Sequence, residues 1–155
     1  MYWRQSRTQF EDQHGEINRR SIKALVDSEN IPGLLAYDGD APVGWCSIAP
    51  REEFPTLQRS RILKPVDDQH VWSVVCFFVA RGQRKQGLTV QLLIAAIEYA
   101  RSNGAKIIEG YPVEPKGDKS PDVFVYTGLF SAFKKAGFTE VLRRSETRPI
   151  MRYYI

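Results

Sequence analysis

The sequence predicts an α/β fold, a mixed sheet built around one central βαβ unit, and three observations lead to this prediction. Residues 71–79 are apolar and rich in β-branched side chains, which is typical of a strand buried on both faces. Apolar residues then recur at helical spacing over 88–100, and residues 106–109 follow as a short strand. A strand, a helix and a strand in this order form a βαβ unit, so part of the sheet is expected to be parallel.

Shorter elements are expected before this unit. Residues 1–7 are predicted as a first strand, and the apolar positions of 17–26 fit one face of a helix. Residues 34–37 and 43–49 are predicted as a hairpin, because an Asp-Gly pair suited to a tight turn lies between them. Residues 50–69 are polar and contain two prolines, so we expect a loop with a short helix.

The final third of the chain is expected to close the sheet. After a loop at 113–122, rich in Pro, Gly and Asp, residues 129–136 are predicted as a helix that a glycine ends. Residues 138–144 and 150–155 are predicted as two strands. Pro149 lies between them and indicates a bend or an edge position.

Length and composition favour a single domain that spans residues 1–155. The chain has 155 residues, of which 43% are hydrophobic, enough for one substantial core. No apolar window approaches the roughly 18 residues that cross a bilayer, so we expect a cytoplasmic protein that does not enter the membrane. The net charge of +4 is spread along the chain, which leaves nucleic-acid binding as a less favoured alternative.

The chain offers little for metal binding or disulfide chemistry. It has two histidines and two cysteines, and no CxxC motif, so no metal site is expected. Cys46 and Cys76 both lie in apolar runs, where we interpret them as small buried side chains.

The turn between the central strand and the long helix has the features of an anion-binding site. Unpaired backbone N–H groups and the positive end of a helix dipole favour a phosphate at this point. Gly87 lets the backbone approach a ligand closely, and Arg84 and Lys85 add positive charge. The Thr89 hydroxyl is a further hydrogen-bond donor.

Three phosphate-binding motifs compete for this turn. A Walker loop needs Lys directly after its second glycine, where this chain has Leu88. A dinucleotide fingerprint needs three glycines, of which only Gly82 and Gly87 are present. The remaining pattern, Arg-x-x-Gly-x-small, resembles the acetyl-CoA signature Q/R-x-x-G-x-G/A of the GNAT acetyltransferase superfamily.

The resemblance extends over most of the chain. Residues 43–49, the central strand, the turn and its helix follow in the order of GNAT proteins, and Phe133-Lys134-Lys135-Ala136-Gly137-Phe138 is similar to the Tyr-x-x-x-Gly-Phe ending of the fourth GNAT helix. This resemblance implies a twisted, mostly antiparallel sheet and an N-acetyltransferase that uses acetyl-CoA as co-substrate. It also implies an acceptor that is a small-molecule or peptide amine, and it is compatible with a homodimer.

The resemblance also implies a set of cofactor-binding residues. In GNAT folds two neighbouring strands splay apart and the pantetheine arm pairs with free backbone groups of one of them. The pyrophosphate meets the amides of the turn, and one face of the later helix flanks the cofactor. Phe133 and Lys134 fit equally well as a core phenylalanine and a surface lysine. Matched to this chain, the binding residues are Phe77, Phe78, Val79, Arg84, Lys85, Gln86, Gly87, Leu88, Thr89, Phe133 and Lys134.

The chain departs from the family pattern in its catalytic residues. Phe133 stands where the general-acid tyrosine is commonly found, and the strand 71–79 carries no Asp or Glu. The candidate acid is therefore Tyr126, with a buried, structurally satisfied tyrosine as the alternative. The candidate base or amine-binding group is Glu109, with a solvated strand-end carboxylate as the alternative.

Further groups are open for recruiting the acceptor. Asp67 and Asp68 are candidates for attracting a cationic acceptor, and the alternative is that they are solvated loop charges. An acetyl-cysteine intermediate at Cys76 is disfavoured, because direct transfer is usual in the family. The acceptor specificity is expected to depend on the loops 50–69 and 113–122. The function predicted is direct transfer of acetyl from acetyl-CoA to a primary amine. The alternative is a non-catalytic acyl-CoA-binding or regulatory module.

Overall fold

A computed structural model describes residues 1–13, 15–117 and 125–155, and its centre is a six-stranded sheet in the order β1-β2-β3-β4-β6-β5. The β3 and β4 strands are parallel, and the other neighbouring pairs are antiparallel. The predicted mixed, mostly antiparallel sheet with one βαβ unit is therefore confirmed. The strands are β1 (Leu34–Asp38), β2 (Ala41–Pro50), β3 (Trp72–Val79), β4 (Ile107–Gly110), β5 (Thr139–Arg143) and β6 (Pro149–Tyr154).

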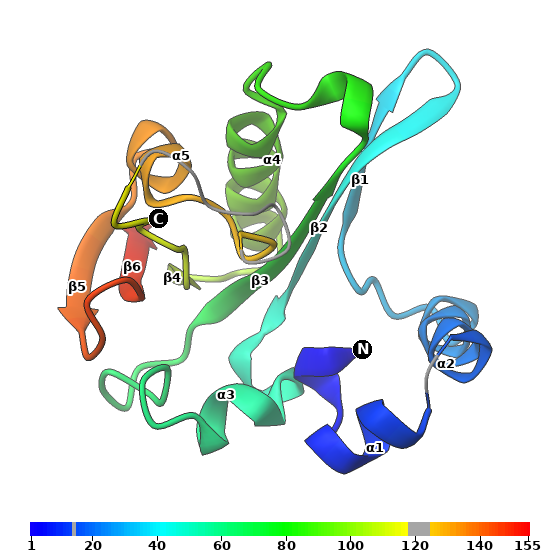
Figure 1. The fold of residues 1–155 in the computed structure, drawn as a ribbon, viewed down its shortest axis with the longest axis horizontal. Helices are drawn as coiled ribbons and strands as arrows, with labels where there is room; N and C mark the ends of the chain where they lie inside the picture. The colour runs from blue at the N-terminus through cyan, green and yellow to red at the C-terminus, as the bar shows by residue number, and fades with distance from the viewer. Residues whose placement is uncertain (14, 118–124) are drawn as a thin grey trace.

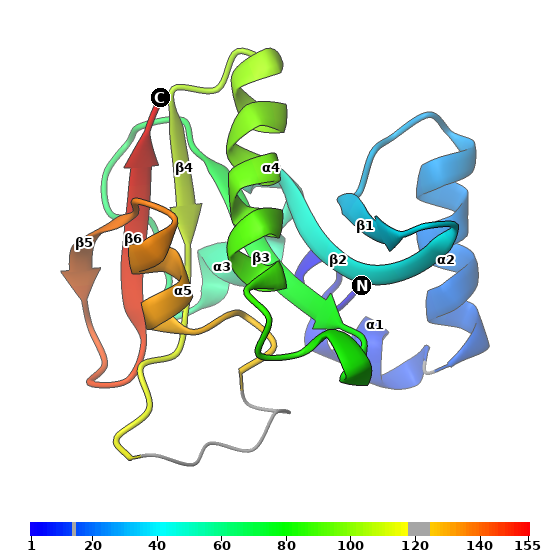
Figure 2. The same cartoon turned by 90° about the horizontal axis from the view of Figure 1, so that it is seen from above.

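Helices cover both faces of the sheet. Figure 1 shows α4 and α5 on one face and α1, α2 and α3 on the other, and the turned view in Figure 2 agrees. The long helix α4 connects β3 to β4, as the apolar periodicity predicted. The helical segments are η1 (Tyr2–Arg4), α1 (Arg7–Asp12), α2 (Glu16–Asp27), η2 (Arg51–Glu53), α3 (Pro55–Arg59), η3 (Arg81–Gln83), α4 (Leu88–Ser102) and α5 (Phe130–Lys135).

The prediction of a strand over residues 1–7 is wrong, because this segment forms η1 and the start of α1. Ser6 and Gln9 make a capping box: the Ser6 hydroxyl accepts from the Gln9 N–H, and the Gln9 side chain accepts from the Ser6 N–H. Trp3 is only 7% exposed and belongs to the core on this face of the sheet. Local capping and the burial of one large ring thus outweigh the β-prone composition.

Pro149 takes a different position from the bend or edge that the sequence indicated. It is the first residue of β6, paired with Arg143, and β6 lies between β4 and β5 inside the sheet. A proline at the first position of a strand is tolerated, because the missing N–H falls at the end of the ladder. Pro55 is placed similarly at the first position of α3, the short helix expected within 50–69.

The core is divided between the two faces of the sheet. Between the sheet and α4 and α5 lies a cluster that includes Leu93, Ile97 and Phe133. On the opposite face Trp3, Phe54 and other side chains form a second cluster. Burying one large apolar side chain contributes about 1.5–3 kcal/mol, so both clusters hold the helices on the sheet.

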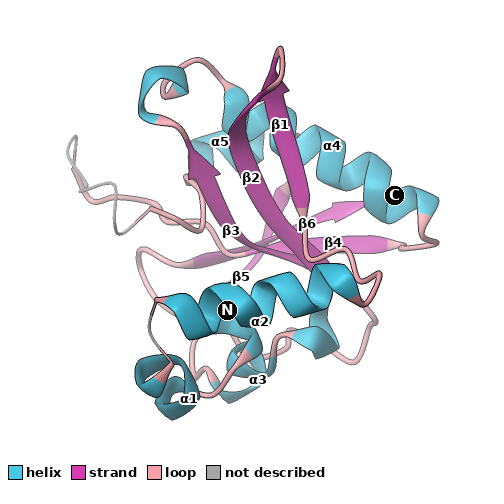
Figure 3. Ribbon diagram, turned by 90° about the vertical axis from the view of Figure 1, so that its right-hand side faces the viewer, coloured by secondary structure: helices cyan, strands magenta, loops and turns pink. Residues whose placement is uncertain are grey.

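The β3 and β4 strands separate after a short contact. Only Trp72–Val74 of β3 pairs with β4, although β3 continues to Val79. A bulge lies at the point of separation, because Ser47 pairs with Cys76 and Ile48 pairs with Val74, which leaves Val75 without a partner on β2. Figure 3 shows β1, β2 and β3 leaning away from β4, β5 and β6.

Candidate functional site

The turn before α4 has an unusual backbone conformation. Gly87 is the N-cap of α4 with φ 83° and ψ 2°, and Lys85 also has a positive φ of 63°. The left-handed region is readily adopted by glycine and costs free energy at a lysine. Turns that contain left-handed residues are able to form concave backbone sites that bind anions. The amides of Leu88 and Thr89 lie in the first turn of α4, where an N–H has no partner four residues earlier within the helix.

Side-chain contacts fix this turn to the end of the sheet. The Gln83 side chain donates to Asp38 Oδ2 over 3.0 Å, which ties η3 to the β1–β2 hairpin. The Arg84 Nε donates to the Val79 carbonyl over 3.1 Å, and the Gln86 amide donates to the Gly82 carbonyl over 2.8 Å. These contacts therefore tie the turn to the ends of β1 and β3.

A cavity of about 710 Å³ opens beside this turn. Its walls are the end of β3, the turn, the start of α4, the segment 125–129 and α5. Most of the residues that the sequence assigned to cofactor binding line this one cavity. They are Phe77, Phe78, Val79, Arg84, Lys85, Gly87, Leu88 and Thr89.

Three residues of the assigned set do not line the cavity. The Gln86 side chain is held at the turn, Lys134 is exposed, and Phe133 is completely buried, with its ring centroid 6.1 Å from that of Phe77. A Cβ at Gly110 would lie 2.0 Å from the Phe133 ring, so Phe133 fills the space beside the end of β4. Phe133 is thus a core residue and does not flank the cavity.

The α5 helix contributes residues to this cavity that were not predicted from the sequence. Its lining includes Ser131, Ala132 and Lys135 rather than Lys134. Positions 131 and 135 are four residues apart and share one face of a helix. With Phe133 taken as the buried face of this helix, the four-residue spacing indicates from the sequence that Ser131 and Lys135 share another face.

The free edge of β3 is partly occupied within the chain. The Phe77 N–H donates to the Tyr126 carbonyl over 2.7 Å, and the Val79 carbonyl accepts from Arg84. From the sequence, these groups were expected to be open for an amide-rich ligand. In this structure the segment that contains Tyr126 takes the place of a neighbouring strand at Phe77.

Tyr126 lines two cavities at once. It borders the cavity at the turn, and it also borders a second cavity of about 590 Å³ near η1, α1 and α2. Phe77 packs in the cluster beneath α4, whereas Val75 and Cys76 line the second cavity. Burial raises the pKa of Tyr126 to about 12, so its hydroxyl keeps its proton at neutral pH. Tyr126 is therefore shared by the two cavities, and its hydroxyl is protonated at neutral pH.

Glu109 lies in a buried ion network and not at the turn. Its Oε1 accepts from Arg51 and from the Tyr111 hydroxyl, at 2.7 and 2.8 Å, and its Oε2 accepts from Arg152 at 2.8 Å. The side chain is completely buried, so the expectation of a solvated strand end is wrong. Both carboxylate oxygens are engaged, and Glu109 lines only a third cavity, of about 200 Å³. We therefore assign it a structural role.

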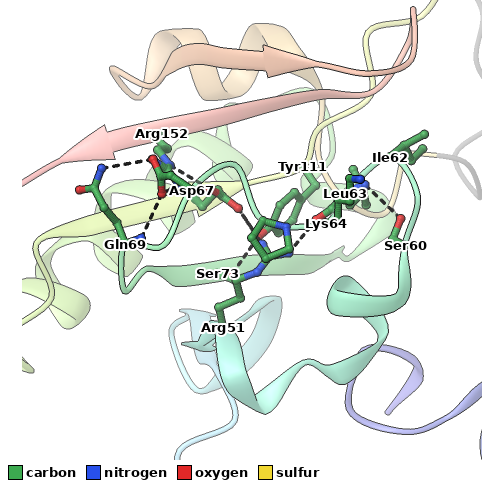
Figure 4. Close-up of polar contacts among 12 residues, drawn as sticks. Arg51, Ser60, Ile62, Leu63, Lys64, Asp67, Gln69, Ser73, Tyr111 and Arg152 are labelled. Carbon is green, nitrogen blue, oxygen red and sulfur yellow. Dashed lines mark hydrogen bonds and ion pairs between the residues drawn. The ribbon is translucent and has the colours of Figure 1, made fainter.

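The network extends to the loop before β3, as Figure 4 shows. Arg152 donates to both carboxylate oxygens of Asp67, at 2.6 and 2.9 Å, and this bidentate bond lowers the pKa of Asp67 to about 2. The Ser73 hydroxyl lies 2.8 Å from the Tyr111 hydroxyl. Asp67 is thus held by the fold rather than free to recruit an acceptor. Asp68 lines the third cavity, away from the turn. No sequence signal pointed to Arg51 as the centre of this network.

The remaining candidate groups have ordinary surroundings. Cys46 and Cys76 are free thiols, and burial raises the pKa of each. In the described residues, no cluster of three or more His, Cys, Asp or Glu side chains is arranged to hold a metal ion. Within the same part of the chain, none of the helices has the length and apolar character that a membrane crossing needs. Of the loop 113–122, residues 118–122 lie outside the described residues.

Comparison with models of known protein families identifies one family that matches this chain. The model of the "Acetyltransferase (GNAT) family" matches residues 1–121. No curated protein matches the chain.

Solved structures share the fold at low sequence identity. The chain is similar to ribosomal-protein-alanine N-acetyltransferase from Brucella melitensis, with 17% identity, a TM-score of 0.58, and coverage of 93% of this chain and 82% of that one. It is also similar to yncA of Salmonella typhimurium, solved with acetyl-CoA, with 15% identity, a TM-score of 0.56, and coverage of 92% and 76%. A third is the paia N-acetyltransferase of Thermoplasma acidophilum, solved with coenzyme A, with 13% identity, a TM-score of 0.55, and coverage of 90% and 72%.

Proposed function

Because the chain belongs to the GNAT family of acetyltransferases, we propose that it transfers the acetyl group of acetyl-CoA to a primary amine. The observation that carries the proposal is the single cavity formed by the splayed end of β3, the glycine turn and the start of α4. Two similar proteins were solved with acetyl-CoA or coenzyme A, which supports acetyl-CoA as the co-substrate.

The residues at the turn fit the phosphate end of this co-substrate. A Cβ at Gly87 would meet no protein atom within 4 Å, so the backbone faces open space where a phosphate can approach. Arg84 and Lys85 add two positive charges, and the first turn of α4 adds N–H donors and the positive end of the helix dipole. On the opposite wall Lys135 provides a further cation.

The pantetheine arm would run from the turn toward Tyr126 along the edge of β3. Gly128 forms part of this wall, and its φ of 93° is one that other residues rarely adopt. An arm that pairs with Phe77 must replace the bond from the Phe77 N–H to the Tyr126 carbonyl. Binding is therefore expected to move the segment around Tyr126 by a small amount.

The proposed reaction is a direct transfer. The neutral amine nitrogen attacks the thioester carbonyl carbon, the C–N bond forms, and the C–S bond breaks with its electron pair on sulfur. The nitrogen loses a proton to solvent, and the Tyr126 hydroxyl donates a proton to the leaving thiolate before it is reprotonated from water. The hydroxyl is protonated at neutral pH, as a proton donor must be, and its pKa of about 12 makes it a weaker acid than an exposed tyrosine.

We further propose the cytoplasm as the place of the reaction. Cys46 and Cys76 are both free thiols, which suits a reducing compartment.

The function is tested by binding and by turnover. Isothermal titration with acetyl-CoA is expected to give saturable binding at submillimolar levels, and a thiol reagent is expected to detect free coenzyme A when a panel of alkyl, aromatic, polycationic and peptide amines is added. Absence of acetyl-CoA binding at millimolar levels would contradict the proposal. Binding without thiol release for any amine would point instead to a non-catalytic module.

A further inference from the structure

We propose that the acceptor is a primary amine on an aromatic body that carries no second cation, and that its ring occupies the 590 Å³ cavity between η1, α1, α2 and the sheet. This inference rests on the proposed acetyl transfer. It starts from Tyr126, because this residue borders both cavities and therefore marks the point where a ligand in one meets a ligand in the other.

The composition of the second cavity favours a flat apolar ligand. Its size falls within the usual range of roughly 300–1,000 Å³ for small-molecule sites. Six aromatic side chains contribute to its walls, and aromatic walls bind a ring through offset and edge-to-face contacts. They are Tyr2, Trp3, Phe10, Trp45, Phe54 and Tyr126.

These rings are already packed against each other. The Tyr2 ring lies edge-on to Trp3 and to Phe10, with centroid distances of 5.0 and 5.5 Å, and the Trp3 and Tyr126 centroids are 6.4 Å apart. Trp3 is nearly buried, which fixes it in place. The walls formed by Tyr2, Trp3 and Phe10 therefore lose little conformational freedom when a ligand binds, so this part of the cavity is preorganised.

The charges around the cavity argue against a polycationic acceptor. Among the described residues that line it, none is Asp or Glu. The side-chain cation Arg4 is paired with Glu53 and lies over the Phe54 ring, 4.7 Å from its centroid. The Ser47 hydroxyl donates to the Pro32 carbonyl, so it too is engaged. A second ammonium group would lose its water here and find no carboxylate in exchange.

The same walls favour an amine that arrives without its proton. Aromatic and aliphatic side chains form most of the lining, so ions are expected to be poorly solvated there. The pKa shifts agree in direction, because burial raises the pKa of Tyr126 to about 12, raises that of Cys76 and lowers that of the Met1 ammonium, which also lines the cavity. The described lining offers no carboxylate base. The amine therefore loses its proton to solvent before it reaches the thioester, and kcat/KM is expected to rise with pH up to the pKa of the free amine.

The first experiment compares matched amines at saturating acetyl-CoA by thiol release. Tryptamine and 2-phenylethylamine carry a ring, n-butylamine has one charge and no ring, and spermidine has additional cations. We expect kcat/KM for the aromatic amines to exceed that for the other two by roughly tenfold or more, since burying a ring is worth well over 1.4 kcal/mol. Equal or faster turnover of n-butylamine or spermidine would overturn the inference and leave acetyl transfer intact. Loss of turnover with every amine would overturn both.

A pair of variants on one helix tests the charge argument. Ile22 lines the cavity, and Ile17 on the same helix is 50% exposed and is not part of the lining. Ile22→Glu places a carboxylate in the wall and is expected to shift the preference toward spermidine by roughly tenfold, while Ile17→Glu leaves the preference unchanged. The KM for acetyl-CoA is expected to stay the same in both. An identical preference profile in Ile22→Glu and the wild type would contradict this placement of the acceptor.

Discussion

At the scale of single residues, Tyr126 connects most of the chemistry proposed here. Its carbonyl accepts from the Phe77 N–H, its hydroxyl is protonated at neutral pH, and the residue borders both cavities. The position that the resemblance matches to the general-acid tyrosine of the GNAT pattern holds Phe133, which is buried in the core. The general acid is therefore expected to have moved from α5 to the segment that precedes it.

Replacing one hydroxyl tests this role. Tyr126→Phe keeps the ring and removes the proton donor, so kcat is expected to fall by about 100-fold while the KM for acetyl-CoA changes little. In the wild type, with a pKa of about 12 for this tyrosine, activity is not expected to decline through its ionisation below pH 10. Steady-state rates over pH 6 to 10 check both statements.

The control for this change is Tyr37→Phe, because Tyr37 is 59% exposed on β1 and lines none of the three cavities described above. Its kcat is expected to equal that of the wild type. Unchanged kcat in Tyr126→Phe would remove Tyr126 from the mechanism and return it to the reading of a structural tyrosine.

At the scale of elements, α4 and the turn before it act as one unit. The helix is fixed in the core by buried residues such as Leu93 and Ile97, and its first turn faces the cavity. Both ends of the helix carry a glycine with a positive φ, Gly87 with 83° and Gly104 with 79°. Only Gly87 lines the cavity.

This symmetry offers a matched pair of variants. Gly87→Ala and Gly104→Ala each force a Cβ into a left-handed backbone and should each cost about 1–2 kcal/mol of folding free energy. A Cβ at either position meets no protein atom within 4 Å. Only Gly87→Ala places a methyl group where a phosphate is proposed, so acetyl-CoA affinity is expected to fall by about tenfold in that variant alone.

Isothermal titration at a temperature where both variants are folded measures the two affinities, and thermal unfolding measures the two stabilities. Equal acetyl-CoA affinity in Gly87→Ala and Gly104→Ala would mean that the phosphates bind elsewhere.

At the scale of the whole molecule, a buried ion network joins segments that are distant in the sequence. Arg51 follows β2, Glu109 lies on β4, Arg152 lies on β6, and Asp67 belongs to the loop before β3. Arg51 also donates to the Leu63 carbonyl over 2.7 Å. The network therefore holds this loop and three parts of the sheet in one arrangement, at the end where β3 and β4 still pair.

Breaking this network is expected to lower the free energy of unfolding, and not only the catalytic rate. Glu109→Gln leaves Arg51 without its buried counter-charge and leaves Arg152 with Asp67 alone, and removing one partner of a buried ion pair typically costs about 3–5 kcal/mol. Glu16→Gln is the control, because Glu16 pairs only with exposed arginines on α2, where an ion pair contributes less than about 1 kcal/mol. Urea unfolding measures both changes. Equal losses in the two variants would contradict a structural role for Glu109.

The sequence by itself determined most of the order of elements and the position of the glycine turn before α4. The apolar run of β3, the periodicity of α4 and the glycine between them are local patterns, and local patterns specify local structure. The exclusion of a Walker loop by Leu88 was also local, since the motif depends on one adjacent residue. The strand expected over residues 1–7 failed because a capping box and the burial of Trp3 outweighed composition.

Only the tertiary structure decided which distant side chains meet. From the sequence alone, Glu109 was a plausible base. In the structure, Arg51 of η2 and Arg152 of β6, which are both distant from it in the sequence, donate to its two carboxylate oxygens. The bulge at Val75 turns Cys76 toward the second cavity, and residue spacing alone does not reveal a bulge. Both outcomes follow from strand pairing and the packing of one element on another, which bring together residues that no local pattern connects.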